Sequence, residues 1–409
     1  MVEQYAIDEQ SSLSKMKVYI QSNNYSQSGY GSQSKMSGNS VMSINGTQTK
    51  YDREKELREF DNTKTGVKGL VDSGVKTIPK IFIRPLEEIS EDSKPQNVNN
   101  KLVLPVIDLA KIHTNNNSRR ELVEQIENAS AKWGFFQVIN HGIPLNVIEK
   151  MLEMVKMFHE QDVEVKMKYY GRDVHTNKQV VYDSNFDLFT SKNAYWRDTL
   201  SVNTAFTGQL DPELLPPICR DAILDHIKHM VQLGSVLLEL MSEALGLGPD
   251  YLKELECDKN WSSVYHYYPS CPQPELTIGT PKHTDSSFFT VLLQDQVGGL
   301  QIRHDDQWVD VRPIPGALVI NIGDLLQMIT NDKFISVLHR VKANPVGPRL
   351  SSAFFFAGLS SKPKKYGPIR ELLSEENPPI YRDFTVGEYV THFFSKPQDE
   401  PGRNHFMLN

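Results

Sequence analysis

Three residues in the C-terminal half of the sequence have metal-binding side chains at a usable spacing. His283 and Asp285 stand two positions apart, and His339 lies in a second, short apolar run. Side chains at positions i and i+2 of a β-strand leave the same face, so an imidazole and a carboxylate would lie side by side. A second strand folded back across the first would add His339. Two histidines and one carboxylate on one face of a metal favour non-haem Fe(II) with open coordination positions.

Two residues suited to binding a carboxylate follow the last histidine. Arg349 and Ser351 also stand two positions apart, so both side chains would leave one face of a strand. The planar guanidinium binds a carboxylate through two parallel hydrogen bonds, and a serine hydroxyl can add a third. The sequence therefore predicts an anion-binding site next to the metal site.

The same His-x-Asp spacing occurs a second time, where it has a simpler explanation. His304 and Asp306 lie in a polar cluster between two apolar runs. Such a cluster is typical of a solvated hairpin tip. We therefore expect this second pair to be structural and not a metal site.

The segments around these residues predict the fold that has to position them. Between Trp261 and Leu359, short apolar runs alternate with turns rich in Gly, Pro and Asp, which is typical of a sandwich or jelly roll. Upstream, apolar residues at helical spacing predict helices over 118–133, from Pro144 onward, and over about 214–247. An apolar run over 135–139 predicts a strand between the first two helices.

The composition is that of a soluble globular protein and argues against several classes. The 409 residues are 39% hydrophobic and 23% charged, and the net charge of −7 gives no reason to expect a nucleic-acid partner. The sequence has no apolar run long enough to predict a membrane span. The three cysteines lack CxxC spacing, which favours a reducing compartment without a disulfide framework. We expect a cytoplasmic, monomeric protein.

Several motifs resemble the core of the plant 2-oxoglutarate- and Fe(II)-dependent dioxygenases. Within these enzymes the sequence is similar to the 1-aminocyclopropane-1-carboxylate oxidase homologues and to their alkaloid-hydroxylase type. The motifs, in chain order, are HYYPSCPQPEL from His266, KHTDSS from Lys282, GGLQI from Gly298, NIGDLLQMITND from Asn321, LHRV from Leu338 and GPRLS from Gly347. The resemblance extends from about Phe60 into the C-terminal region and is specific for the class of reaction.

The resemblance implies a fold, a set of cofactors and a role for each motif residue. The fold is mainly β with flanking helices, around a double-stranded β-helix (jelly roll) that holds Fe(II) between its two sheets. The cosubstrate 2-oxoglutarate would chelate the iron, and its distal carboxylate would meet Arg349, Ser351 and Tyr268. O2 is consumed, succinate and CO2 are released, and ascorbate serves as supporting reductant. The resemblance gives His141 a structural place in a turn, and His266 departs from the Asn of many relatives.

Composition and resemblance together divide the chain into four stretches. Residues 1–50 are rich in Ser, Asn and Gln without apolar periodicity, which predicts a disordered extension. Residues 51–256 form an N-terminal helical region with the first core strands, 257–362 the jelly roll, and 363–409 a closing C-terminal segment.

The substrate is predicted only in outline. The resemblance implies a small molecule, with an indole alkaloid as the leading case and flavonoids, terpenoids and benzoxazinoids as competitors. We expect an aromatic pocket wall formed by Tyr182, Phe186, Trp196 and Phe356. Arg197 is the obvious candidate for binding an acidic substrate in this segment, but the adjacent Asp198 could already pair with it.

Two functions from other classes remain open on the sequence alone. The first is an ethylene-forming oxidase that uses ascorbate without 2-oxoglutarate. The second is a non-catalytic jelly-roll binding module of the germin or lectin type. A test of 2-oxoglutarate dependence separates the first alternative, and an iron titration separates the second.

Overall fold

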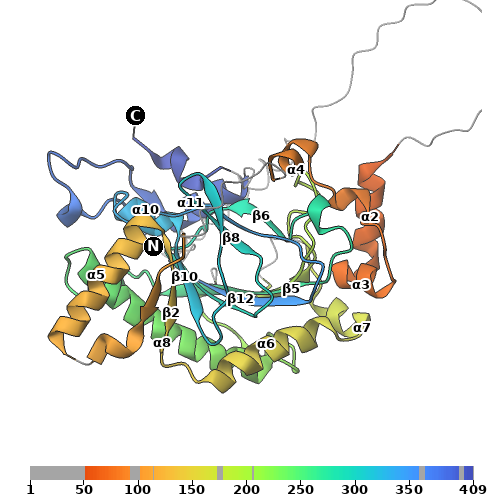
Figure 1. Ribbon diagram of the computed structural model, residues 1–409, viewed down its shortest axis with the longest axis horizontal. Coiled ribbons are helices and arrows are strands. Elements are labelled where there is room, and N and C mark those ends of the chain that lie inside the picture. Colours follow the sequence, from red (N-terminus) through yellow and green to blue (C-terminus); the bar gives the residue numbers. More distant parts are fainter. Residues whose placement is uncertain are drawn as a thin grey trace, which may run out of the picture. The chain divides into compact units, whose positions relative to one another are not determined.

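The protein is built around a large sheet that continues across the boundary predicted near residue 257. The structure, a computed structural model, describes residues 51–92, 102–113, 115–172, 178–204, 207–358, 364–395 and 400–408. The predicted extension over residues 1–50 therefore lies outside the described residues. Residues from Asp52 onward form one compact unit, drawn in Figure 1.

The larger sheet has eight strands in the order β1-β2-β10-β7-β12-β5-β4-β3. All its pairings are antiparallel except that between β1 and β2. Its strands are β1 (Val106–Asp108), β2 (Phe135–Ile139), β3 (Val180–Asp183), β4 (Asp198–Asn203), β5 (Asn260–Tyr268), β7 (Phe289–Gln294), β10 (Leu318–Ile322) and β12 (Arg349–Ala357).

The smaller sheet has four antiparallel strands in the order β6-β11-β8-β9. These strands are β6 (Thr280–His283), β11 (His339–Val341), β8 (Leu300–His304) and β9 (Gln307–Asp310). A third, two-stranded sheet pairs β13 (Lys365–Tyr366) with β14 (Phe384–Thr385) near the C-terminus. The two main sheets form the jelly roll that the alternating apolar runs predict, so the predicted fold class is confirmed.

Helices cover one face of the larger sheet, as Figure 1 shows for α6 and α8. Phe356 of β12 packs so closely on α8 that a Cβ at Gly234 would lie 2.2 Å from its ring. The helices are α2 (Arg53–Thr63), α3 (Gly66–Asp72), α4 (Leu86–Asp92), α5 (Asn116–Lys132), α6 (Leu145–His159), α7 (Val163–Lys166), α8 (Arg220–Ala244), α9 (Tyr251–Glu254), α10 (Asp324–Ile329) and α11 (Val386–Ser395). The three longest of them, α5, α6 and α8, match the helices predicted from apolar spacing.

Strand alternation gives the larger sheet two chemically different faces. On β12, Phe354 and Phe356 point to the helices and belong to the main hydrophobic core. Arg349 and Ser351 have the opposite parity, so their side chains leave the other face. We call this second face the inner face, because it carries the residues that contact the metal-binding group described below.

Two histidines that the sequence assigns to structure lie in turns or hairpins. His304 ends β8 and pairs with Gln307 across a two-residue turn, in which Asp305 and Asp306 have positive φ angles of 46° and 57°. Its ring stacks on Trp133 at 3.7 Å between centroids. His141 bonds the carbonyl of Gly316 through Nε2, at 2.8 Å. Both structural assignments are therefore confirmed.

No helix among the described residues is long and apolar enough to cross a membrane. The three cysteines are buried and their thiols are free. Their burial also places them in the packed interior, where they act as small apolar side chains.

Two histidines buried beneath the helices should make the fold sensitive to acid. Burial lowers the pKa of His159 and of His226 to about 3 in each case. The ring of His159 is fully buried and stacks on Tyr267. The unfolded chain binds protons on these rings below about pH 6.5, and the folded chain does not. The contribution of these two histidines to the free energy of unfolding is therefore fully present above about pH 6.5. It is lost as the pH falls toward 3.

We expect His226→Gln to reduce this acid sensitivity. Both ring nitrogens of His226 are buried without a hydrogen-bond partner, so the group titrates only on unfolding. The fall in thermal midpoint between pH 6.5 and pH 4.5 should be smaller in the variant than in the wild type. His405→Gln, a change at an exposed histidine, is the control. Equal slopes for His226→Gln and the wild type would contradict this role of burial.

Candidate metal centre

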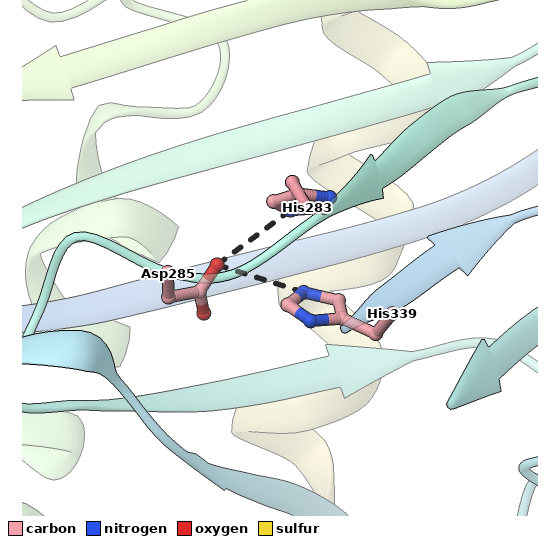
Figure 2. A group of neighbouring side chains, drawn as sticks. All are labelled: His283, Asp285 and His339. Atoms are coloured by element: carbon pink, nitrogen blue, oxygen red, sulfur yellow. Dashed lines mark ion pairs between the residues drawn. The ribbon is translucent and has the colours of Figure 1, made fainter. Parts of the chain in front are cut away.

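The two predicted histidine ligands lie directly opposite each other on neighbouring strands. His283 ends β6, and His339 opens β11, its antiparallel partner, in direct register. Their ring centroids are 4.1 Å apart. The strand ends at His283, so Asp285 lies in the following turn and not on the same strand as predicted. The residues that follow the strand nevertheless bring its carboxylate beside both rings, as Figure 2 shows.

The three side chains converge tightly enough to hold a single metal ion. Oδ1 of Asp285 lies 3.6 Å from Nε2 of His283 and 3.5 Å from Nε2 of His339. One ligand atom from each residue lies within 4.8 Å of the others, and this is the one such group of three among the described residues. The nitrogen-to-oxygen distances of 3.5 and 3.6 Å are in the range expected of ligands about 2 Å from a shared ion.

Backbone hydrogen bonds orient both imidazoles for binding through Nε2. Nδ1 of His283 lies 2.9 Å from the carbonyl oxygen of Pro281, and Nδ1 of His339 lies 3.2 Å from that of Val337. A carbonyl oxygen only accepts, so each Nδ1 carries the proton and each Nε2 keeps its lone pair for a metal. This tautomer is the one that a metal site requires.

The carboxylate is oriented by two side chains from the larger sheet. Oδ2 of Asp285 accepts hydrogen bonds from Oγ1 of Thr290 at 2.5 Å and from Nδ2 of Asn321 at 2.7 Å. Thr290 on β7 and Asn321 on β10 are paired in register, so both leave the inner face together. Oδ1 then remains free for the metal.

The electrostatics of the group favour the protonation states that bind a cation. Burial raises the pKa of Asp285, but the nearby His339 and His283 and the two hydrogen bonds outweigh burial, so its pKa lies below the usual value. Burial, reinforced by His339, lowers the pKa of His283 to about 3. An ionised carboxylate and a neutral imidazole are the forms that coordinate metals.

A buried arginine without an acidic partner lies on the same inner face. Arg349 is 1% exposed, and its guanidinium donates to Oγ of Ser351 at 3.1 Å and to Oε1 of Gln294 at 3.0 Å. Its Nε has no hydrogen-bond partner, and no carboxylate among the described residues lies within ion-pair distance. The guanidinium also lies 4.9 Å from the ring centre of Tyr268, directly across the strand pair. A buried cation in this state is costly unless an anion binds to it.

Sequence comparison matches this site to a known family. The profile of the 2OG-Fe(II) oxygenase superfamily matches residues 260–358, which contain all three ligands and Arg349. A second profile, described as the non-haem dioxygenase in morphine synthesis N-terminal region, matches residues 104–217. The sequence is 53% identical over 349 residues to 1-aminocyclopropane-1-carboxylate oxidase homolog 1 of Arabidopsis thaliana, covering 85% of this chain and 94% of that protein. The chain belongs to the 2OG-Fe(II) oxygenase superfamily.

Other relatives carry different names at similar identity. Deacetoxyvindoline 4-hydroxylase of Catharanthus roseus is 49% identical over 362 residues, covering 87% of this chain and 89% of that protein. Among solved structures, JOX2 in complex with 2OG, Fe and JA superposes with a TM-score of 0.72 at 29% identity, covering 84% of this chain and 98% of that chain. These matches fix the class of reaction and leave the substrate open.

The oxygenase is thus a non-haem Fe(II)/2-oxoglutarate enzyme, and its residues fit that metal. His283, Asp285 and His339 hold Fe(II), which with 2-oxoglutarate supplies the oxygen chemistry of the reaction. The three residues would supply one ligand atom each. Thr290 and Asn321 would keep the carboxylate of Asp285 oriented toward the metal.

The predicted aromatic wall is not where the sequence placed it. Tyr182 contacts Phe158 beneath the helices, and Phe356 packs on α8, so both lie on the face away from the metal. Trp196 is fully buried in a separate cluster with Phe82. Phe356 differs from Ser351 by an odd number of positions, and strand alternation therefore turns it outward. These three residues therefore do not form the predicted wall, and the place of Phe186, which is partly exposed and contacts Phe394, remains a prediction.

Two aromatic residues that were not predicted from the sequence lie on the inner face. Phe355 pairs in register with Thr290, and Phe135 pairs in register with Asn321, so both flank the residues that orient Asp285. Phe135 also meets the ring of His339 edge-on at 5.1 Å. Counting in steps of two from Ser351 would have selected Phe355 instead of its neighbour.

The C-terminal segment supports the loop that carries Asp285. Asp324, fully buried at the start of α10, accepts hydrogen bonds from Oγ1 of Thr284 at 3.0 Å, the hydroxyl of Tyr389 at 2.5 Å and Nη1 of Arg403 at 2.8 Å. Its backbone N–H donates to the carbonyl oxygen of Asp285 at 2.9 Å. The closing segment therefore stabilises the metal-binding turn through one buried carboxylate.

We expect Arg403→Ala to lower the free energy of unfolding by about 3 kcal/mol. This value is the lower end for breaking a buried ion pair, and it applies because Arg403 is partly exposed. The loss arises because Asp324 stays buried without its cation. Urea unfolding measures the change, and Arg403→Lys, which keeps a charge, should recover part of it. A change below about 0.5 kcal/mol, as is usual at an unimportant surface site, would contradict the support role.

Proposed function

We propose that the enzyme binds 2-oxoglutarate with its 2-oxo acid end at the metal and its distal carboxylate on Arg349. The observation that carries this proposal is the buried guanidinium of Arg349, which has a free Nε and no acidic partner among the described residues. Ser351 lies beside it at 3.1 Å and Tyr268 packs against it, so a hydroxyl and a ring complete the site. A carboxylate would satisfy the planar fork that the protein itself leaves open.

For the second substrate we propose a bulky specialised metabolite of plants, with an indole alkaloid as the leading case. The similarity to deacetoxyvindoline 4-hydroxylase supports an alkaloid, and the inner-face aromatics Phe135 and Phe355 support a large, partly apolar scaffold. The reaction is hydroxylation or a related oxidation, with release of succinate and CO2. Ascorbate would serve as a supporting reductant. Flavonoids, terpenoids and benzoxazinoids are competing scaffolds for the same site.

The test supplies representatives of each scaffold class with Fe(II), ascorbate and 2-oxoglutarate, and follows product mass together with succinate. We expect one class to give an oxidised product in a fixed ratio to succinate. Turnover that continues without 2-oxoglutarate would contradict the cosubstrate. Efficient conversion of 1-aminocyclopropane-1-carboxylate to ethylene, with no product from any bulky scaffold, would contradict the proposed substrate class.

A further inference from the structure

A second buried arginine, Arg197, lies on the inner face beside the cosubstrate residues. It directly precedes β4, in which Thr199 pairs with His266 of β5 and Asp198 pairs with Tyr267. Thr199 contacts Nδ1 of His266 at 3.0 Å, on the same face as Tyr268. Arg197 stands two positions before Thr199, and its side chain leaves the strand toward this same face.

A hydrogen bond ties Arg197 to the strand that carries His283. Nη1 of Arg197 donates to Oγ1 of Thr280 on β6 at 2.7 Å, and that oxygen lies 3.0 Å from the hydroxyl of Tyr268. Burial, followed by the charges of Arg197 and Arg349, lowers the pKa of His266 well below its usual value, which is consistent with both cations lying near one another. Arg197 therefore lies in the space between the two sheets.

The neighbouring acid does not neutralise this arginine, contrary to the sequence-based expectation. Asp198 points to the opposite face, where it accepts from the backbone N–H groups of Val67 and Lys68, both at 2.8 Å, and from the hydroxyl of Ser184. Alternation along the strand separates the two adjacent side chains. Asp198 is therefore fully used by other partners.

The guanidinium of Arg197 is left with unused hydrogen-bonding capacity in a buried place. Arg197 is 6% exposed, its Nε has no partner, and among the described residues it forms no ion pair within 4 Å. Asp183 and Asp187 are near enough to act on its charge, but neither contacts it. Asp187 instead accepts from the hydroxyl of Tyr195 at 3.2 Å. A buried donor in this state costs stability unless a ligand supplies the acceptor.

We propose that Arg197 binds a carboxylate of the second substrate, which makes the substrate a bulky carboxylic acid. This inference rests on the proposed function, because the metal and Arg349 already account for both carboxylates of 2-oxoglutarate. One buried, unpaired guanidinium therefore remains for a different anion. A carboxylate held there, next to Thr280 of the metal-bearing strand β6, would fix which carbon of the scaffold faces the iron.

The test compares carboxylic acids with their methyl esters on the Mn(II)- and 2-oxoglutarate-loaded protein by calorimetry. The probes are indole-3-acetic, cinnamic and abietic acid, each with its methyl ester. In the wild type we expect at least one acid to bind about tenfold or more tightly than its ester, as a charge-assisted hydrogen bond implies. In Arg197→Gln the acid should bind no better than its ester, while the affinity for 2-oxoglutarate stays unchanged.

Two further variants separate binding from folding. Arg197→Lys should keep part of the preference for the acid, because the charge remains. Arg84→Gln removes another buried arginine, one paired with Asp92, and should leave the preference intact. Thermal midpoints of all variants show whether each is folded.

Three results would overturn the inference. The first is a wild type that binds every acid no better than its ester. The second is an Arg197→Gln variant that keeps the preference. The third is a loss of 2-oxoglutarate affinity in Arg197→Gln, which would assign Arg197 to the cosubstrate. A wild type that fails to bind 2-oxoglutarate at all would instead contradict the proposed function, and this inference with it.

Discussion

Replacing His339 with alanine should abolish turnover and reduce bound iron to background while leaving the protein folded. His339 supplies one of only three protein ligand atoms, and its Nε2 lies 3.5 Å from the shared carboxylate oxygen. The two remaining ligands should hold a metal ion far more weakly, because water takes the place of the lost imidazole. Iron content by elemental analysis and succinate formation measure the two effects. The same result is expected for His283→Ala and Asp285→Ala.

The chain offers a matched control for this substitution in its second His-x-Asp pair. His304 lies on β8, the strand next to β11, but it is not one of the converging ligands, and its ring stacks on Trp133. His304→Ala should therefore keep iron and activity and lose only the stacking contact. Near-normal iron content in His339→Ala, or loss of iron in His304→Ala, would show that the ligand assignment is wrong.

Arg349→Lys should raise the dissociation constant for 2-oxoglutarate by about 30-fold or more. Removing one partner of a buried, charged pair costs about 2–5 kcal/mol, and lysine keeps the charge, so the lower end applies. The loss comes from the fork: an ammonium cannot donate two parallel hydrogen bonds to one carboxylate while also reaching Ser351 and Gln294. Calorimetry with the Mn(II)-loaded protein measures binding without turnover.

Metal binding provides the internal control for the Arg349 variant. Arg349 contacts none of the three ligands, so the affinity for Mn(II) should stay within about twofold of the wild type, a difference far below 1.4 kcal/mol. Arg84→Lys, a change at a buried arginine paired with Asp92, should leave 2-oxoglutarate binding unchanged. An unchanged dissociation constant in Arg349→Lys would remove Arg349 from the cosubstrate site.

The three metal ligands could be predicted from the sequence and do converge, although β6 ends at His283 and Asp285 lies beyond it. Arg349 and Ser351 share a strand face by alternation alone, and the register then places them opposite Tyr268 and His266 of β5. The sequence analysis expected a second strand, folded back across the first, to add His339, and β11 does pair with β6 with His339 opposite His283. For such residues, two-residue periodicity carries most of the three-dimensional information.

The residues that the sequence did not predict depend on contacts between distant strands. Asn321 and Thr290 orient the metal carboxylate only because β10 and β7 pair in one register. Arg197 lacks Asp198 as an ion-pair partner because Asp198 instead accepts hydrogen bonds from the first turn of α3, more than a hundred residues upstream. Residue type alone does not predict the aromatic wall, because strand alternation turns Tyr182 and Phe356 to the face away from the metal. Local sequence does not encode these long-range choices.

The most direct test of the central claim is an anaerobic titration of the Fe(II)-loaded protein with 2-oxoglutarate, followed by visible absorption. Chelation of Fe(II) by a 2-oxo acid produces a new absorption band, which reports the metal and the cosubstrate together. We predict that the band appears in the wild type and saturates with one 2-oxoglutarate per chain, that it needs a higher concentration in Arg349→Lys, and that it is absent in His339→Ala. A wild type without the band, or a band of equal size in His339→Ala, would contradict the assignment of the site.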